Sequence, residues 1–106
     1  MAEIKVYKVG EVLDTSTSKV EQDAISNIID DGANVALDLS ECKYVSSAGL
    51  RVMLYSYKLA ATKNLKLYLI GVSSEIREVM RITGFERFFS YFDTVDDCLS
   101  QCNGSH

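Results

Sequence analysis

The stretch VALDLSECKYVSSAGLRVMLYSYKLAATK, residues 35–63, changes its hydrophobic period halfway along and decides how the chain folds. Residues 35–39 form a nearly continuous apolar run, which is typical of a strand buried on both faces. Residues 44–45 are a second short apolar patch. Beyond them, apolar side chains recur at helical spacing, at Leu50, Met53, Leu54, Tyr57 and Ala61. We therefore predict a central strand, a turn and a helix.

Ser46 and Ser47 stand where this helix is predicted to begin. A helix N-terminus has unpaired N–H groups and the positive end of the helix dipole. A serine hydroxyl there caps the helix, and a phosphate there would be stabilised. The alternatives for Ser47 are therefore an ordinary cap and a regulatory modification site.

The predicted helix has a second apolar face opposite the first. At about 100° per residue, its members are Ala48, Val52, Tyr55 and Leu59. Since one apolar face suffices for a core, the second is covered either by another part of the chain or by a partner.

Five segments together carry a resemblance to a known family: residues 38–40, residues 44–50, the Gly-Glu-Val-Leu-Asp loop at 10–14, residues 67–72 and residues 83–88. They resemble the STAS domain of bacterial anti-sigma-factor antagonists, which also occurs as the cytoplasmic tail of sulfate transporters. The family's loop reads Gly-Glu-Leu-Asp, so that this chain has one residue inserted. The resemblance covers nearly the whole chain.

The resemblance implies a phosphorylation switch that acts on transcription. Ser47 aligns with the phosphorylated serine of the antagonists, with Ser46 as the second choice, and Asp14 aligns with an acidic residue beside it. The implied partners are an anti-sigma factor with serine kinase activity, whose sequestration frees a sigma factor, and a PP2C-type phosphatase. The expected contact residues are Asp14, Ser46, Ala48, Gly49, Val52, Tyr55 and Leu59.

The family usually has Asp where this chain has Ser46. This departure favours an alternative function, a non-phosphorylated scaffold or dimerisation module that forms a homodimer through the second apolar face. A weaker alternative is the binding of a nucleotide or a lipid near Asp14 and Ser47.

Length, net charge and the length of the apolar runs exclude several classes of function. The 106 residues suit a single domain, which we place at 1–102 with a disordered tail at 103–106. A net charge of −4 argues against sequence-independent nucleic-acid binding and fits a basic protein partner better. The apolar runs are too short for a membrane span, and residues 1–5 lack the pattern of a signal peptide, so that we expect a cytoplasmic protein without membrane contact.

We expect no enzymatic activity, no metal site and no cofactor. The single histidine is His106, so that no hydrolase triad can be assembled. Cys42, Cys98 and Cys102 lack CxxC spacing and are interpreted as reduced thiols, the last two as core side chains. The acidic residues near the turn are interpreted as caps and solvated carboxylates rather than as a magnesium or acid–base site.

The remaining periodicity alternates between strands and helices. An opening strand ends at Gly10, a helix ends at Gly32, and a further helix begins at Ser73 and Ser74 and ends at Gly84. The aromatic segment 85–92 predicts a last short strand, and Thr94 opens a final helix through Cys102. We therefore predict an α/β fold with a mainly parallel central sheet of about four strands and four helices. Sites in such folds lie beyond the carboxyl ends of the strands.

Overall fold

A central parallel sheet organises the computed structural model, which describes residues 3–103. Its strands are β1 (Ile4–Lys8), β3 (Asn34–Asp38), β5 (Leu67–Ile70) and β6 (Ser90–Phe92), in the order β1-β3-β5-β6. Every neighbouring pair is parallel. The predicted α/β class and the four-stranded sheet are therefore confirmed.

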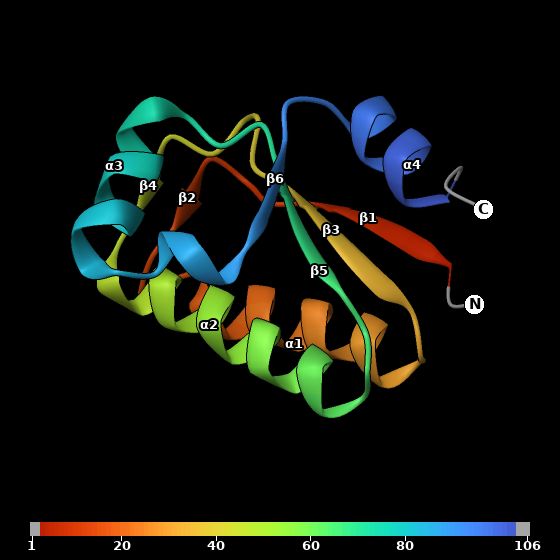
Figure 1. The fold of residues 1–106 in the computed structure, drawn as a ribbon. Helices are drawn as coiled ribbons and strands as arrows, with labels where there is room; N and C mark the ends of the chain where they lie inside the picture. Colours follow the sequence, from red (N-terminus) through yellow and green to blue (C-terminus); the bar gives the residue numbers. More distant parts are fainter. Residues whose placement is uncertain (1–2, 104–106) are drawn as a thin grey trace.

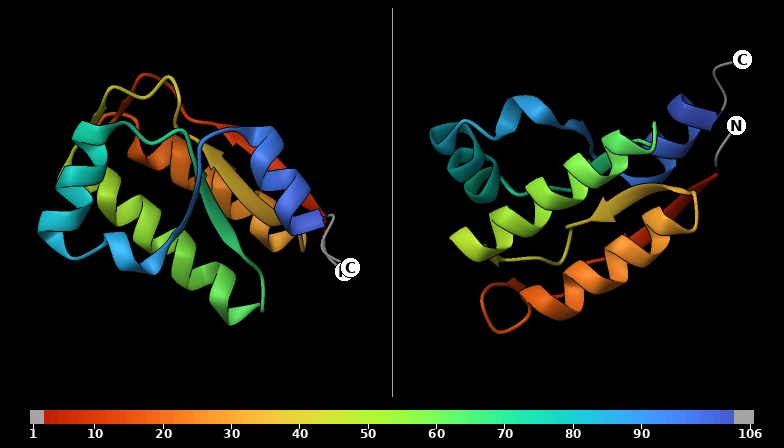
Figure 2. Two further views of the ribbon diagram at one scale, coloured as in Figure 1. Left: turned by 45° about the horizontal axis from the view of Figure 1, so that its top comes forward. Right: turned by 90° about the horizontal axis from the view of Figure 1, so that it is seen from below.

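Helices cover both faces of this sheet (Figure 1). On one face α1 (Ser18–Asp30) and α2 (Ser47–Thr62) lie side by side, as the right-hand view of Figure 2 shows. On the other face α4 (Val95–Asn103) packs against β3, β5 and β6. The fourth helix, α3 (Ser74–Thr83), lies at the end of the molecule farther from α4.

The alternation of side chains along β3 separates two cores. Val35 and Leu37 point into the main core with the buried residues of α1 and α2, whereas Ala36 lies in a smaller core with Ile70 and Cys98. Because successive strand residues face opposite sides of a sheet, a strand that is apolar at consecutive positions needs a layer on both sides. This is why the run at residues 35–39 could be identified as a doubly covered strand.

Two very short strands were not predicted as strands. β2 (Val12–Leu13) and β4 (Tyr44–Val45) pair in parallel as a separate two-stranded sheet, and a 3₁₀ helix, η1 (Glu86–Phe88), occupies part of the aromatic segment. Two residues are too few to show a period of two, so that sequence patterning cannot identify such strands.

The predicted helix ends of the second half of the chain are confirmed. The Oγ of Ser73 accepts a hydrogen bond from the backbone N–H of Ile76 at 3.2 Å, and Gly84 ends α3 in the left-handed conformation with φ 82°. The Oγ1 of Thr94 accepts from the N–H of Asp97 at 3.0 Å. Helix α4 continues to Asn103, one residue into the predicted tail, and residues 104–106 lie outside the described part of the chain.

The cysteines are free thiols, as predicted. Cys98 is fully buried between α4 and the sheet, and burial raises its pKa to about 11. Within residues 3–103, no three side chains of His, Cys, Asp or Glu are grouped so that they could hold a metal ion. No helix in these residues is long and apolar enough to span a bilayer.

Candidate functional site at the start of helix α2

Ser46 and Ser47 have different roles at the start of α2. Ser46 is the N-cap: its backbone is extended, and its Oγ accepts a hydrogen bond from the backbone N–H of Gly49 at 3.3 Å. Ser47 is the first helical residue and is exposed, and its hydroxyl forms no hydrogen bond within the described residues. The ordinary cap considered for Ser47 is therefore assigned to Ser46, which leaves the hydroxyl of Ser47 accessible.

This division predicts different effects of alanine substitution on stability. Ser46→Ala removes the cap and is expected to lower the free energy of unfolding by about 1 kcal/mol. Ser47→Ala is expected to change it by less than about 0.5 kcal/mol, because an exposed first-turn hydroxyl without a partner contributes little. Urea unfolding of both variants measures the difference, and an equal loss in both would contradict the assignment of the cap.

The small sheet brings the loop of Asp14 to the serine pair. Leu13 pairs with Val45 in register, and the backbone N–H of Ser46 donates to the carbonyl oxygen of Leu13 at 3.0 Å. Asp14 and Ser46 therefore leave the two strands side by side. The chain enters β2 after β1 and enters β4 after β3, so that the site lies beyond the carboxyl ends of two central strands, as expected for this fold class.

The carboxylate of Asp14 is held by its own loop. Its Oδ1 accepts hydrogen bonds from the hydroxyl of Ser16 at 2.7 Å, from the N–H of Ser16 at 2.9 Å and from the N–H of Thr17 at 3.3 Å. These bonds, above all the one from the Ser16 hydroxyl, hold the pKa of Asp14 below its ordinary value. Asp14 is therefore ionised at neutral pH, and its loop holds a negative charge in one orientation at the end of β2.

Removing the Ser16 hydroxyl is expected to raise the pKa of Asp14 toward its ordinary value. Because the folded-state pKa is depressed, the hydrogen bonds contribute stability above the unfolded-state pKa, and this contribution is lost as the pH falls through the folded-state pKa. A ¹³C NMR titration of Asp14 in Ser16→Ala measures the rise. Ser18→Ala is the control, since the Ser18 hydroxyl donates to the carbonyl of Thr15 instead. An unchanged pKa in Ser16→Ala would contradict the assignment.

Two of the expected contact residues are not at the surface. Gly49 is buried, and Val52 is 2% exposed and belongs to the main core. Since α1 packs along α2, the second apolar face is covered largely by the chain itself, which corrects the expectation that Val52 meets a partner. A charged substitution at Val52 would therefore disturb folding, whereas Tyr55, at 46% exposure, is the position at which to test the homodimer expected through this face. Ala48 and Leu59 are half-buried.

Sequence reasoning missed two basic residues near the site. Arg51 and Lys58 line an open groove of about 410 Å³ together with Gln22, Leu54 and Tyr55. Their signal was present, because Ser47, Arg51 and Lys58 stand at i, i+4 and i+11 and hence on one side of a helix. Because both residues are basic, they do not belong to either apolar face of the helix and were not among the expected contact residues.

Comparison with known proteins points to one family. The model of the STAS domain family matches residues 2–98. BtrV of Bordetella bronchiseptica, which is named as a candidate anti-sigma factor antagonist, is 32% identical over 80 residues, which are 76% of this chain and 69% of BtrV. RsfB of Mycobacterium tuberculosis, an anti-sigma-F factor antagonist, is 25% identical over 107 residues, which are 95% of this chain and 83% of RsfB.

Solved structures agree in fold. The anti-sigma factor antagonist SpoIIAA in its unphosphorylated form superimposes with a TM-score of 0.83 at 18% identity, covering 100% of this chain and 93% of SpoIIAA. The phosphorylated form of the Bacillus protein gives a TM-score of 0.74 at 17% identity, with 95% and 92% covered. At such identities the agreement concerns the architecture alone.

Proposed function

This chain belongs to the STAS domain family, and from that premise we propose that it is an anti-sigma-factor antagonist controlled by phosphorylation of Ser47. In this proposal it is a protein-binding module without enzymatic activity. It sequesters an anti-sigma factor that is also a serine kinase, and so frees a sigma factor for transcription. Two curated relatives named for the antagonist function support the proposal.

The observation that carries the proposal is the exposure of the Ser47 hydroxyl. Ser46 already caps α2, so that a kinase can modify Ser47 without removing a hydrogen bond from the fold. A phosphate there adds about −1.5 to −2 charges at neutral pH. The helix N-terminus favours that charge, and the folded chain therefore tolerates it.

The phosphate is expected to change the affinity for the partner rather than the stability of the fold. Asp14 follows β2 just as Ser46 follows the paired strand β4, so that the new charge adds to a negative group at the same end of this small sheet. In an interface, two neighbouring negative groups must be desolvated and repel acidic groups of the partner. Phosphorylation would weaken binding while the fold stays intact, and a PP2C-type phosphatase would restore binding.

Phosphopeptide mass spectrometry across residues 42–51 tests the proposal on protein isolated from its native host under several growth conditions. We expect a condition-dependent fraction of phosphate, placed on Ser47 by fragment ions. Ser47→Ala expressed in the same host is the matched control and should yield the peptide without phosphate. A wild-type peptide without phosphate in every condition, or with phosphate only on Ser46, would contradict the proposal.

A further inference from the structure

The groove along α2, whose first lining residue Arg51 follows Ser47 by one turn, combines two basic side chains with two large apolar ones. Arg51 and Lys58 stand seven residues apart on α2, with Leu54 and Tyr55 between them, and Gln22 of α1 faces them across the groove. Tyr55 is 46% exposed, so that its ring is accessible to a ligand in the groove. Along the helix the groove extends over about two turns, or about 10 Å.

The positive charges of this groove are not neutralised by the chain. Helix α2 contains no acidic residue, and Arg51 and Lys58 form no ion pair within residues 3–103. The two ion pairs nearest in the helix layer, Lys19 with Asp23 and Lys63 with Asp30, involve other lysines.

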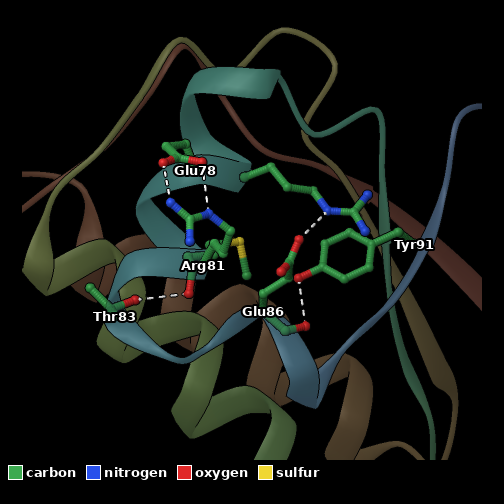
Figure 3. A network of polar contacts seen from close by, with 7 residues as sticks. Glu78, Arg81, Thr83, Glu86 and Tyr91 are labelled. Atoms are coloured by element: carbon green, nitrogen blue, oxygen red, sulfur yellow. Dashed lines mark hydrogen bonds and ion pairs between the residues drawn. The ribbon is translucent and has the colours of Figure 1, made fainter.

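Two arginines of α3 are paired within the chain, and Figure 3 shows Arg81 with its partner Glu78. Nε of Arg81 donates to Glu78 at 2.9 Å, and Nε of Arg77 donates to Glu86 at 2.9 Å. The carbonyl oxygen of Glu86 also accepts a hydrogen bond from the hydroxyl of Tyr91 at 2.8 Å. Both arginines of α3 are thus paired inside the chain, whereas Arg51 and Lys58 form no ion pair within residues 3–103.

We propose that this groove binds an acidic amphipathic segment of the partner protein, with carboxylates on Arg51 and Lys58 and an apolar side chain against Tyr55. The proposal rests on the proposed function, because it names the chemistry of the partner at that same site. It also revises the expectation, drawn from the net charge, that the partner is basic. A balance of −4 averages over the whole surface, while the residues that line this groove include two basic side chains and no acidic one.

The groove also connects the modification to binding. Arg51 stands four residues after Ser47 and therefore on the same side of the helix, one turn away. A phosphate on Ser47 lies within reach of its guanidinium group, which pairs readily with phosphate oxygens. Phosphorylation and the acidic segment therefore compete for Arg51, so that the modification removes a cation from the partner's binding site as well as adding negative charge.

A protein segment fits the groove better than a membrane or a nucleic acid. Both of those ligands present extended arrays of charge and are bound through broad basic surfaces. Here two cations flank one aromatic ring on a chain of net charge −4. A short amphipathic helix with a few carboxylates matches this area and charge.

The test titrates the ¹⁵N-labelled full chain with synthetic amphipathic peptides that share one apolar face. One peptide has Glu on its polar face, the second has Lys at the same positions, and a third is a scrambled acidic peptide. We expect the acidic amphipathic peptide to shift the amide signals of Gln22, Arg51, Tyr55 and Lys58, and to bind at least about tenfold more tightly than the other two, which is about 1.4 kcal/mol. Its affinity should fall with added salt.

Variants distinguish binding in the groove from a general effect of the charge of the protein. The double variant Arg51→Gln with Lys58→Gln should bind the acidic amphipathic peptide at least about tenfold less tightly than the wild type does. Lys5→Gln with Lys66→Gln removes the same charge from exposed positions outside the groove and should change nothing. Ser47→Asp should weaken the peptide in the wild-type background and have a smaller effect when Arg51 is already Gln. An unchanged pattern of amide signals in the free variants verifies that they are folded.

Several outcomes would overturn the inference. They are equal binding of the acidic and basic peptides, shifts that lie outside the groove, and tighter binding of phosphatidylglycerol vesicles or single-stranded RNA than of the acidic peptide. Since the peptide assay needs neither kinase nor phosphate, it fails or succeeds independently of the mass spectrometry. An unmodified Ser47 with a functional groove would reject the switch alone.

Discussion

Ser47→Asp is expected to weaken capture of the anti-sigma kinase by about 100-fold, or about 2.7 kcal/mol, because like charges placed together in an interface cost several kcal/mol. The free energy of unfolding should stay within about 0.5 kcal/mol of wild type, since an acidic residue in the first turn of a helix is favourable. Ser47→Ala should bind the kinase as the unmodified protein does, and should remain bound when ATP is added. Calorimetry with the kinase that phosphorylates Ser47, together with urea unfolding, measures both quantities.

Helix α3 provides a matched control for this prediction. Ser74 is the first residue of α3 and follows the N-cap Ser73, just as Ser47 follows Ser46 in α2. Ser74→Asp therefore introduces the same charge at the same helical position, on an exposed residue of a different helix. It should leave kinase binding unchanged. If Ser74→Asp weakened binding as much as Ser47→Asp, the effect would reflect total charge and the proposed contact face would be wrong.

Gly49→Ala is expected to destabilise the protein by about 3 kcal/mol, which is the upper range for added atoms in a packed interior. A Cβ at this position would overlap the carbonyl oxygen of Leu13 and lie 2.9 Å from both Cγ of Leu13 and Cγ1 of Val45. These atoms belong to β2 and β4, so that neither can move without breaking the pairing that sets Asp14 beside the serines. Thermal unfolding should show a fall of roughly 15 °C.

Gly10 is the control for Gly49. A Cβ at Gly10 meets nothing within 4 Å, so that Gly10→Ala should change the free energy of unfolding by less than about 0.5 kcal/mol. The same substitution thus separates close packing from the general effect of replacing a glycine. A Gly49→Ala variant as stable as Gly10→Ala would show that helix α2 does not lie as close to β2 as the structure has it. In that case Gly49 would again be a candidate contact residue, as the sequence analysis expects.

Local spacing in the sequence determined the four helices, the strands of the central sheet and several helix caps, but not the short strands β2 and β4. The alternation of periods gave the α/β class and the doubly covered strand β3, since strand and helix periodicities depend only on residues close in sequence. The caps at Ser73, Gly84 and Thr94 could be identified for the same reason, because a cap involves groups three or four residues apart. The two consecutive serines at the predicted start of a helix, Ser46 and Ser47, also indicated the candidate site.

Only the tertiary structure decided what each residue of the site does. The division between Ser46 as cap and Ser47 as exposed hydroxyl depends on where the helix begins, to within one residue, and this is fixed by the bond from Ser46 to the carbonyl of Leu13. The burial of Val52 depends on α1 packing along α2, and the approach of Asp14 depends on pairing between β2 and β4. These contacts join segments some 30 residues apart, and no local period encodes which segments pair. Periodicity depends on residues close in sequence, but the packing of distant segments decides which residues of an apolar face are buried, as Val52 is, and which are exposed, as Tyr55 is.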